Sequence, residues 1–112
     1  MIRILGAGVM GLTLATELTA RGHAVELVDP APAAPGPQAC SWWAGGMLAP
    51  CCERESAEEP VQRHGMTAID WWDHHAGGVS RKGTLVLTLG RDRDELTRFA
   101  RRTSGHQPVD GN

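Results

Sequence analysis

The chain opens with the stretch Met-Ile-Arg-Ile-Leu-Gly-Ala-Gly-Val-Met-Gly (residues 1–11), and this stretch decides the fold. Residues 1–5 form a short apolar run that ends abruptly at a glycine, which is typical of a buried strand. Residues 9–21 are predicted to form a helix that Gly22 ends. A second apolar run, residues 24–28, predicts a second strand. The first thirty residues therefore predict a β–α–β unit with parallel strands.

Composition and charge exclude several classes of protein. The chain has 112 residues, which is one small domain at most, and 11 Lys and Arg balance 13 Asp and Glu. A net charge of −2 excludes a strongly basic protein that binds nucleic acid or anionic membranes. No stretch approaches the roughly 20 apolar residues of a membrane span. Three cysteines cannot form a closed disulfide framework, so we expect a reducing, cytoplasmic setting.

The same opening residues loosely resemble a secretory signal peptide, because Arg3 is followed by an apolar run. Three regularly placed glycines lie inside that run, however, and Glu17 interrupts its end. These features favour a strand, turn and helix over a signal peptide.

The three glycines form a G-x-G-x-x-G motif between the first predicted strand and the predicted helix. Gly6 permits a tight turn, Gly8 lets a pyrophosphate approach the backbone, and Gly11 lets the helix pack on the strand. The unpaired N–H groups at the helix start favour anions. Asp29 follows the second strand, where a carboxylate accepts hydrogen bonds from a ribose. With no Lys or Arg close behind it, a 2′-phosphate is disfavoured. A glycine-rich turn without a ligand is the alternative.

The rest of the chain gives weaker signals. Residues 30–39 contain four of the seven prolines and predict an irregular loop. We expect a helix over residues 60–75 with Pro60 as its first residue, a strand over residues 83–89, and a charged helix over residues 92–102.

The segment Cys40-Ser-Trp-Trp-Ala-Gly-Gly-Met-Leu-Ala-Pro50 carries the more specific signal. From its Ser41 onward, and together with residues 6–11 and Asp29, the chain resembles the FAD-dependent amine and amino-acid oxidases of the D-amino-acid oxidase type. Within that family, it is most similar to the glycine oxidases of thiamine biosynthesis.

The resemblance implies that the cofactor is FAD and assigns a role to each matching position. Residues 9–10 would contact the diphosphate, residues 29–30 the adenosine ribose, residues 40–41 the phosphate and ribityl region, and residues 45–47 the isoalloxazine. Cys40 stands where the family often has a hydroxyl residue, and the two glycines of the last group could instead form a flexible hinge. The predicted cofactor-binding residues are Gly6, Gly8, Val9, Met10, Gly11, Asp29, Pro30, Cys40, Ser41, Gly45, Gly46 and Met47.

The resemblance also implies the reaction and the domain organisation. Members of the family transfer a hydride from an amino acid or amine to the flavin and release an imine and peroxide. An Arg, often with a Tyr, binds the substrate carboxylate there, but this chain has no Tyr, so no catalytic residue is assigned. We expect the α/β, Rossmann-like FAD-binding domain to be partial (residues 1–75). The first strand and helix of a substrate domain (76–103) and a disordered tail (104–112) would follow it.

On this interpretation the chain is an N-terminal fragment that alone binds FAD weakly or not at all. The expected partner is a small amino acid or amine, with a homo-oligomer possible for the full-length parent, and no nucleic acid or membrane. An NAD-binding Rossmann protein and a non-catalytic nucleotide-binding module are the alternatives. No metal site is predicted, because the acidic and histidine side chains near residue 70 favour a solvated helix surface. They are His64, Asp70, Asp73, His74 and His75.

Overall fold

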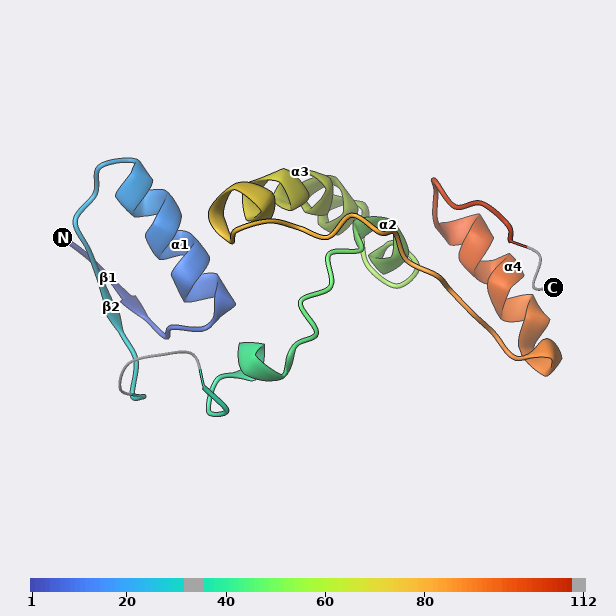
Figure 1. The fold of residues 1–112 in the computed structure, drawn as a ribbon, viewed down its shortest axis with the longest axis horizontal. Coiled ribbons are helices and arrows are strands. Elements are labelled where there is room, and N and C mark those ends of the chain that lie inside the picture. Colours follow the sequence, from blue (N-terminus) through green and yellow to red (C-terminus); the bar gives the residue numbers. More distant parts are fainter. Residues whose placement is uncertain (32–35, 110–112) are drawn as a thin grey trace. The chain divides into compact units, whose positions relative to one another are not determined.

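The fold is known from a computed structural model that describes residues 1–31 and 36–109. The chain divides into two compact units, residues 1–47 and residues 48–112. Each unit has its own secondary structure (Figure 1), and each is described by itself. This division does not test the predicted domain boundary near residue 75, which stays a prediction.

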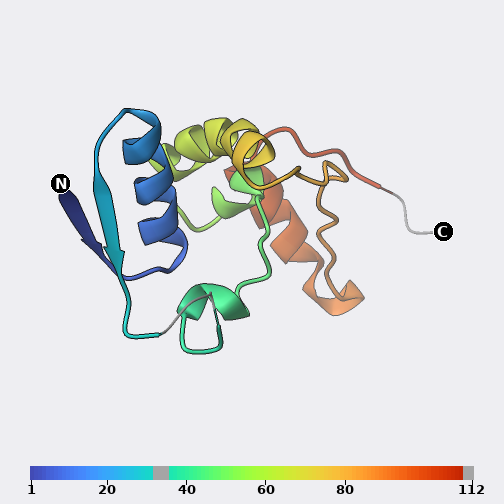
Figure 2. The ribbon, with the colours of Figure 1, turned by 60° about the vertical axis from the view of Figure 1, so that its left-hand side comes forward.

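The first unit contains the predicted β–α–β arrangement. Strand β1 (Ile2–Leu5) is followed by helix α1 (Val9–Ala20) and strand β2 (Val25–Val28). The strands pair in parallel, with Ile2 opposite Val25 and Leu5 opposite Val28. Helix α1 lies along both strands (Figures 1 and 2). Ile4, whose Cγ2 would lie 3.5 Å from a Cβ built on Gly11 of that helix, is only 8% exposed. The predicted β–α–β unit with parallel strands is therefore confirmed.

Helix α1 ends as the sequence predicts. Gly22 has a φ of +81°, a conformation that glycine adopts without strain. Its N–H donates to the carbonyl of Thr19, and the N–H of His23 donates to that of Leu18. This pair of bonds satisfies carbonyls at the end of the helix and turns the chain into β2.

The turn between β1 and α1 depends on two glycines. Gly6 has a φ of +100°, and its carbonyl oxygen would lie only 1.9 Å from a Cβ atom built on Gly11. Real Cβ atoms essentially never approach another atom closer than 3.0 Å. Helix α1 can therefore approach the end of β1 only because residue 11 has no side chain, as the motif predicts.

The second unit is helical. Helix α2 (Pro50–Glu53) packs against helix α3 (Glu59–His75), and both Ala49 and Pro50 are buried. A Cβ on Gly65 would lie 2.6 Å from Cβ of Pro50, so the two helices meet at a glycine. The predicted helix over residues 60–75 is confirmed, with Pro60 as its second residue instead of its first.

Helix α4 (Arg93–Arg102), preceded by the short helix η2 (Gly90–Asp92), confirms the charged helix predicted over residues 92–102. Glu55 links it to the rest of the unit. The Glu55 carboxylate lies 3.4 Å from Arg98 and 3.7 Å from Arg102, and Arg102 also donates to its carbonyl at 3.1 Å. These ion pairs are partly exposed, so we assign them orientation of the helix and little stability.

The strand predicted over residues 83–89 is wrong. No strand forms over these residues, and no other segment of residues 36–109 pairs with them. Leu87, one of three leucines that alternate along this segment, is 79% exposed. Alternation of leucines describes a strand that has one covered face, but a strand also needs a neighbour for its backbone hydrogen bonds. The described part of the chain offers none.

The remaining segments differ from their predictions in smaller ways. Residues 40–50, for which only a binding role is predicted above, contain the short helix η1 (Cys40–Trp43). Part of the predicted proline-rich loop, residues 32–35, lies outside the described residues. So do residues 110–112 of the predicted disordered tail, and residues 104–109 form neither helix nor strand.

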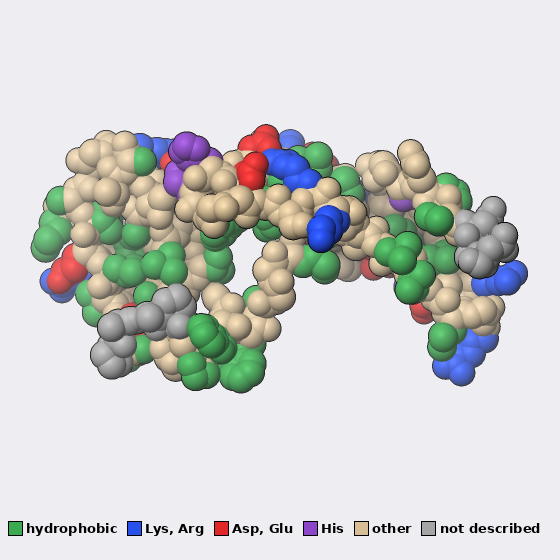
Figure 3. Space-filling model, viewed as in Figure 1, with side chains coloured by type: hydrophobic (Ala, Val, Ile, Leu, Met, Phe, Trp, Pro, Cys, Tyr) green, Lys and Arg blue, Asp and Glu red, His purple; other side chains and the backbone are tan. Residues whose placement is uncertain are grey.

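Both units expose much apolar surface, because the described elements provide too little cover. The space-filling view shows hydrophobic side chains at the surface over α1 and the two strands (Figure 3). Ile2, Leu5 and Val28 are among the exposed strand residues. Parallel sheets are normally covered on both faces, and the described elements leave much of this sheet uncovered.

We expect Gly11→Ala to lower the free energy of unfolding of the chain by about 2 kcal/mol, because the new methyl group overlaps the Gly6 carbonyl. Urea unfolding followed by circular dichroism measures this change. Gly90→Ala is the control, since nothing lies within 4 Å of a Cβ built there. Equal stability of the two variants would show that the contact between α1 and β1 is not as tight as described.

Candidate functional site

The glycine-rich turn is bonded to the end of the neighbouring strand. The N–H of Gly6 donates to the carbonyl of Val28 at 2.8 Å, which continues the β1–β2 pairing by one bond. The next N–H, that of Ala7, donates to Oδ2 of Asp29 at 2.7 Å. The predicted ribose-binding carboxylate thus lies directly beside the predicted phosphate-binding turn.

Asp29 is also bonded on its other side. Its Oδ1 accepts the N–H of Ala31 at 2.9 Å, an arrangement common where an Asp precedes a proline in a turn. The two backbone N–H groups, that of Ala7 first, hold the pKa of the Asp29 carboxyl below its ordinary value of 3.8. A carboxylate has about four acceptor positions, so both oxygens can still accept bonds from hydroxyl groups.

Ser41 joins the same turn from the segment that carries the second motif. Its Oγ accepts the N–H of Val9, the first residue of α1, at 2.9 Å. It would also lie 3.3 Å from a Cβ built on Gly8. Residues 6–11, Asp29 and Ser41, all predicted from sequence, therefore lie around one turn.

The start of α1 retains free donors. Among the residues that the structure describes, the N–H groups of Gly8, Met10 and Gly11 have no acceptor. They lie at the positive end of the helix dipole, beside two glycines that leave the backbone bare. Any side chain on Gly8 would crowd Ser41. This cradle of donors fits the diphosphate of a dinucleotide such as FAD.

The other predicted site residues are not tied to the turn by any described contact. Cys40 is exposed and not part of a disulfide. Gly46 has a φ of +64°, a Cβ on Gly45 would meet nothing within 4 Å, and Met47 is 70% exposed. Their roles, and that of Pro30, stay predictions.

Two functional details were missed by sequence reasoning. The motif predicted that Asp29 binds a ribose but did not reveal its bond with Ala7. The family resemblance predicted that Ser41 contacts the cofactor but did not reveal its bond with Val9. The Asp-Pro pair, a frequent turn former, was a signal for the first detail. Nothing in the sequence indicated the second, because 32 residues separate the partners.

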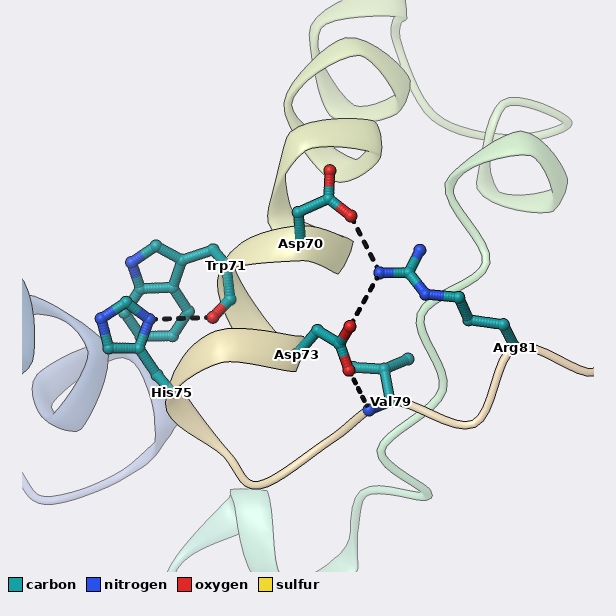
Figure 4. Close-up of polar contacts among 6 residues, drawn as sticks. All are labelled: Asp70, Trp71, Asp73, His75, Val79 and Arg81. Atoms are coloured by element: carbon teal, nitrogen blue, oxygen red, sulfur yellow. Dashed lines mark hydrogen bonds and ion pairs between the residues drawn. The ribbon is translucent and has the colours of Figure 1, made fainter.

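The acidic residues of α3 bind an arginine (Figure 4). Arg81 donates to Asp70 at 2.8 Å and to Asp73 at 3.2 Å, and Asp73 also accepts the N–H of Val79 at 2.7 Å. The bonds from Val79 and Arg81 lower the pKa of Asp73. His75 stacks on Trp71. The cluster closes the turn after α3, and no potential metal site is found among residues 1–31 and 36–109.

The second unit contains a shallow hollow of about 180 Å³. It is smaller than typical small-molecule sites, which have volumes of roughly 300–1,000 Å³, and none of the predicted site residues line it. Its lining residues are Cys52, Glu55, Val86, Leu87, Thr88, Glu95, Leu96, Arg98 and Phe99. We assign no function to it. No helix in the described part of the chain has the length and apolar character needed to cross a membrane.

Comparison with known proteins places the chain in a family. The family model described as FAD dependent oxidoreductase matches residues 1–111. The chain therefore belongs to the FAD-dependent oxidoreductases, and the predicted resemblance and cofactor are confirmed.

A relative from Rhizobium etli, provisionally named thiamine biosynthesis oxidoreductase ThiO, is 52% identical over 110 residues. The match covers 97% of this chain and 33% of the relative, so the chain spans about a third of the length of the curated relative it matches. No solved structure matches the chain significantly.

We expect the stability of the chain to fall as the pH drops below about 4, in part through Asp29. The pKa of Asp29 is lower in the folded state than in the unfolded state. Its contribution to the free energy of unfolding is therefore present above its ordinary pKa and is lost as the pH falls through the folded value. Urea unfolding between pH 2 and 6 measures the effect.

In Asp29→Asn this part of the acid-induced loss should be missing, so its stability should depend less on pH. Asp94→Asn controls for the change in net charge, because Asp94 is exposed and has no partner among the described residues. If Asp29→Asn showed the full wild-type loss, the bonds from Ala7 and Ala31 would not stabilise the ionised carboxylate.

Proposed function

We propose that the first unit binds the ADP portion of FAD. The observation that supports this most directly is the turn at residues 6–11. At the start of α1, three N–H groups have no acceptor among the described residues, and the Asp29 carboxylate lies beside the turn. The N–H groups of Gly8, Met10 and Gly11 would hold the diphosphate, and Asp29 would accept bonds from the ribose hydroxyls. The finer fold assignment, part of a Rossmann-like FAD-binding domain, is included in this proposal.

We further propose that the parent activity is oxidative deamination of glycine or another small amino acid or amine, with release of peroxide. When bound, FAD would supply the redox chemistry of this reaction, as an acceptor of hydride from the substrate that oxygen can regenerate. The sequence of residues 41–50 and the name of the Rhizobium etli relative support this reaction and a role in making the thiazole of thiamine.

The residues of this chain contribute to that activity by binding and positioning. The donors of the turn and the dipole of α1 compensate the charge of the diphosphate. Asp29 selects a ribose with free hydroxyls, because its carboxylate would repel a 2′-phosphate. Residues 40–41 and 45–47 would line the flavin side. We assign no residue of this chain to the substrate carboxylate or to proton transfer.

The remaining predictions belong to the same proposal. Residues 1–75 would belong to the FAD-binding domain and residues 76–103 to the start of the substrate-binding domain. The whole enzyme would work in the cytoplasm, with its cysteines reduced, on a small-molecule substrate. A homo-oligomer of the whole enzyme is compatible with the large exposed apolar surface of this part.

Titration of the purified chain with FAD, NAD and ADP tests the cofactor assignment. We expect ADP to compete with FAD, because the turn and Asp29 both recognise the ADP portion. FAD should bind more tightly than NAD, because residues 40–41 and 45–47 would contact a flavin. Asp29→Ala should weaken FAD and ADP about tenfold, the cost of losing hydrogen bonds to a charged group. Asp94→Ala should leave both affinities unchanged. Calorimetry measures the affinity of both variants for FAD and for ADP.

The outcomes separate the alternatives. Preference for NAD would favour an NAD-binding protein, and equal binding of ADP and FAD would favour a nucleotide-binding module without flavin contacts. We expect weak binding of FAD and no peroxide on addition of glycine. A stoichiometric flavin complex absorbing at about 450 nm that releases peroxide with glycine would show that these 112 residues also contain the substrate site.

A further inference from the structure

The N-cap residue of helix α1 provides no side-chain hydrogen bond to the first turn of the helix. The residue at the N-cap position is Gly8, which has no side chain to accept a hydrogen bond from the first turn. Such a helix start normally leaves its N–H groups to water, or to a Ser, Thr, Asp or Asn at the cap position. Here the N–H of Val9 has an acceptor that lies far away in the sequence, Oγ of Ser41.

The arrangement of Gly8 and Ser41 is specific. A Cβ atom on Gly8 would lie 3.3 Å from Oγ of Ser41, closer than nearly all real contacts of that kind, so the bare glycine makes room for the serine. Short helix η1, which carries Ser41, has a fixed end as well. The indole N–H of Trp43 donates to the carbonyl of Pro37 at 2.9 Å. The hydroxyl is thus presented to α1 by a local structure of its own.

We propose that Ser41 is a positioning residue that caps α1 and joins the second motif to the glycine-rich turn before any cofactor is bound. This inference rests on the proposed function for its consequence, since the turn it positions would bind the diphosphate. By accepting the N–H of Val9, Ser41 leaves the N–H groups of Gly8, Met10 and Gly11 as the donors for a ligand.

The role depends on the hydroxyl and not on the size of the side chain. Ser41→Thr keeps a hydroxyl on Cβ, and Ser41→Val has nearly the same shape without one. This matched pair separates loss of the hydrogen bond from a change in packing. Ser80→Val is the control, because Ser80 is exposed and has no hydrogen bond among the described residues.

The experiment is amide hydrogen exchange of the whole chain, measured by NMR without any ligand. We expect the Val9 amide to exchange about tenfold faster in Ser41→Val than in Ser41→Thr, because a net hydrogen bond of ordinary strength corresponds to that factor. The Val9 amide proton should also shift upfield in Ser41→Val only. Ser80→Val should match the wild type.

Equal Val9 exchange in the Thr and Val variants would overturn the proposal. So would faster exchange in Ser41→Val spread evenly over α1, β1 and β2, since that pattern would reflect general destabilisation. Addition of ADP to the wild-type chain is a separate measurement. If ADP left the amides of residues 6–11 unchanged, the proposed function would fail, while the result on Ser41 and Val9 would stand.

Discussion

The bond from the Ala7 N–H to the Asp29 carboxylate connects the elements on which the candidate site depends. Residue 7 lies between β1 and α1, and Asp29 follows β2 directly, so this one contact ties the turn to the end of the neighbouring strand. The donor is a backbone N–H group, whose position is set by the fold. The acceptor is a charged carboxylate, which strengthens the bond. The glycines at positions 6 and 11 allow the turn to approach this closely. Phosphate-binding and ribose-binding groups are therefore arranged by the same few bonds.

Much of the first unit could be predicted from sequence. The G-x-G-x-x-G spacing, the apolar runs on either side and the stop at Gly22 each constrain the backbone locally, and all agree with the structure. The candidate site was predictable in part, because residues 6–11 and Asp29 belong to one local motif, whereas Ser41 was indicated only by the family resemblance. Its internal bonds were not, because Ser41 reaches Val9 across 32 residues and no local pattern encodes such a contact.

The second unit shows where local patterns stop being sufficient. Helices α3 and α4 were predictable because a helix makes its backbone bonds within itself. Residues 83–89 have an equally regular pattern, yet they form no strand, since a strand is completed by a neighbour and not by its own sequence. The position of Gly65 against Pro50 likewise depends on tertiary packing. In both cases the sequence did not reveal which distant residues a segment would, or would not, contact.

The short separation between paired residues in β1 and β2 has a consequence for synthesis on the ribosome. Ile2 pairs with Val25, and Asp29 bonds Ala7, so the whole β–α–β unit is specified within about thirty residues. The residues of this unit leave the ribosome before the rest of the chain. The nascent chain can thus assemble its glycine-rich turn while later residues are still being added. Ser41 can bond to Val9 only after the residues that follow β2 have also been added.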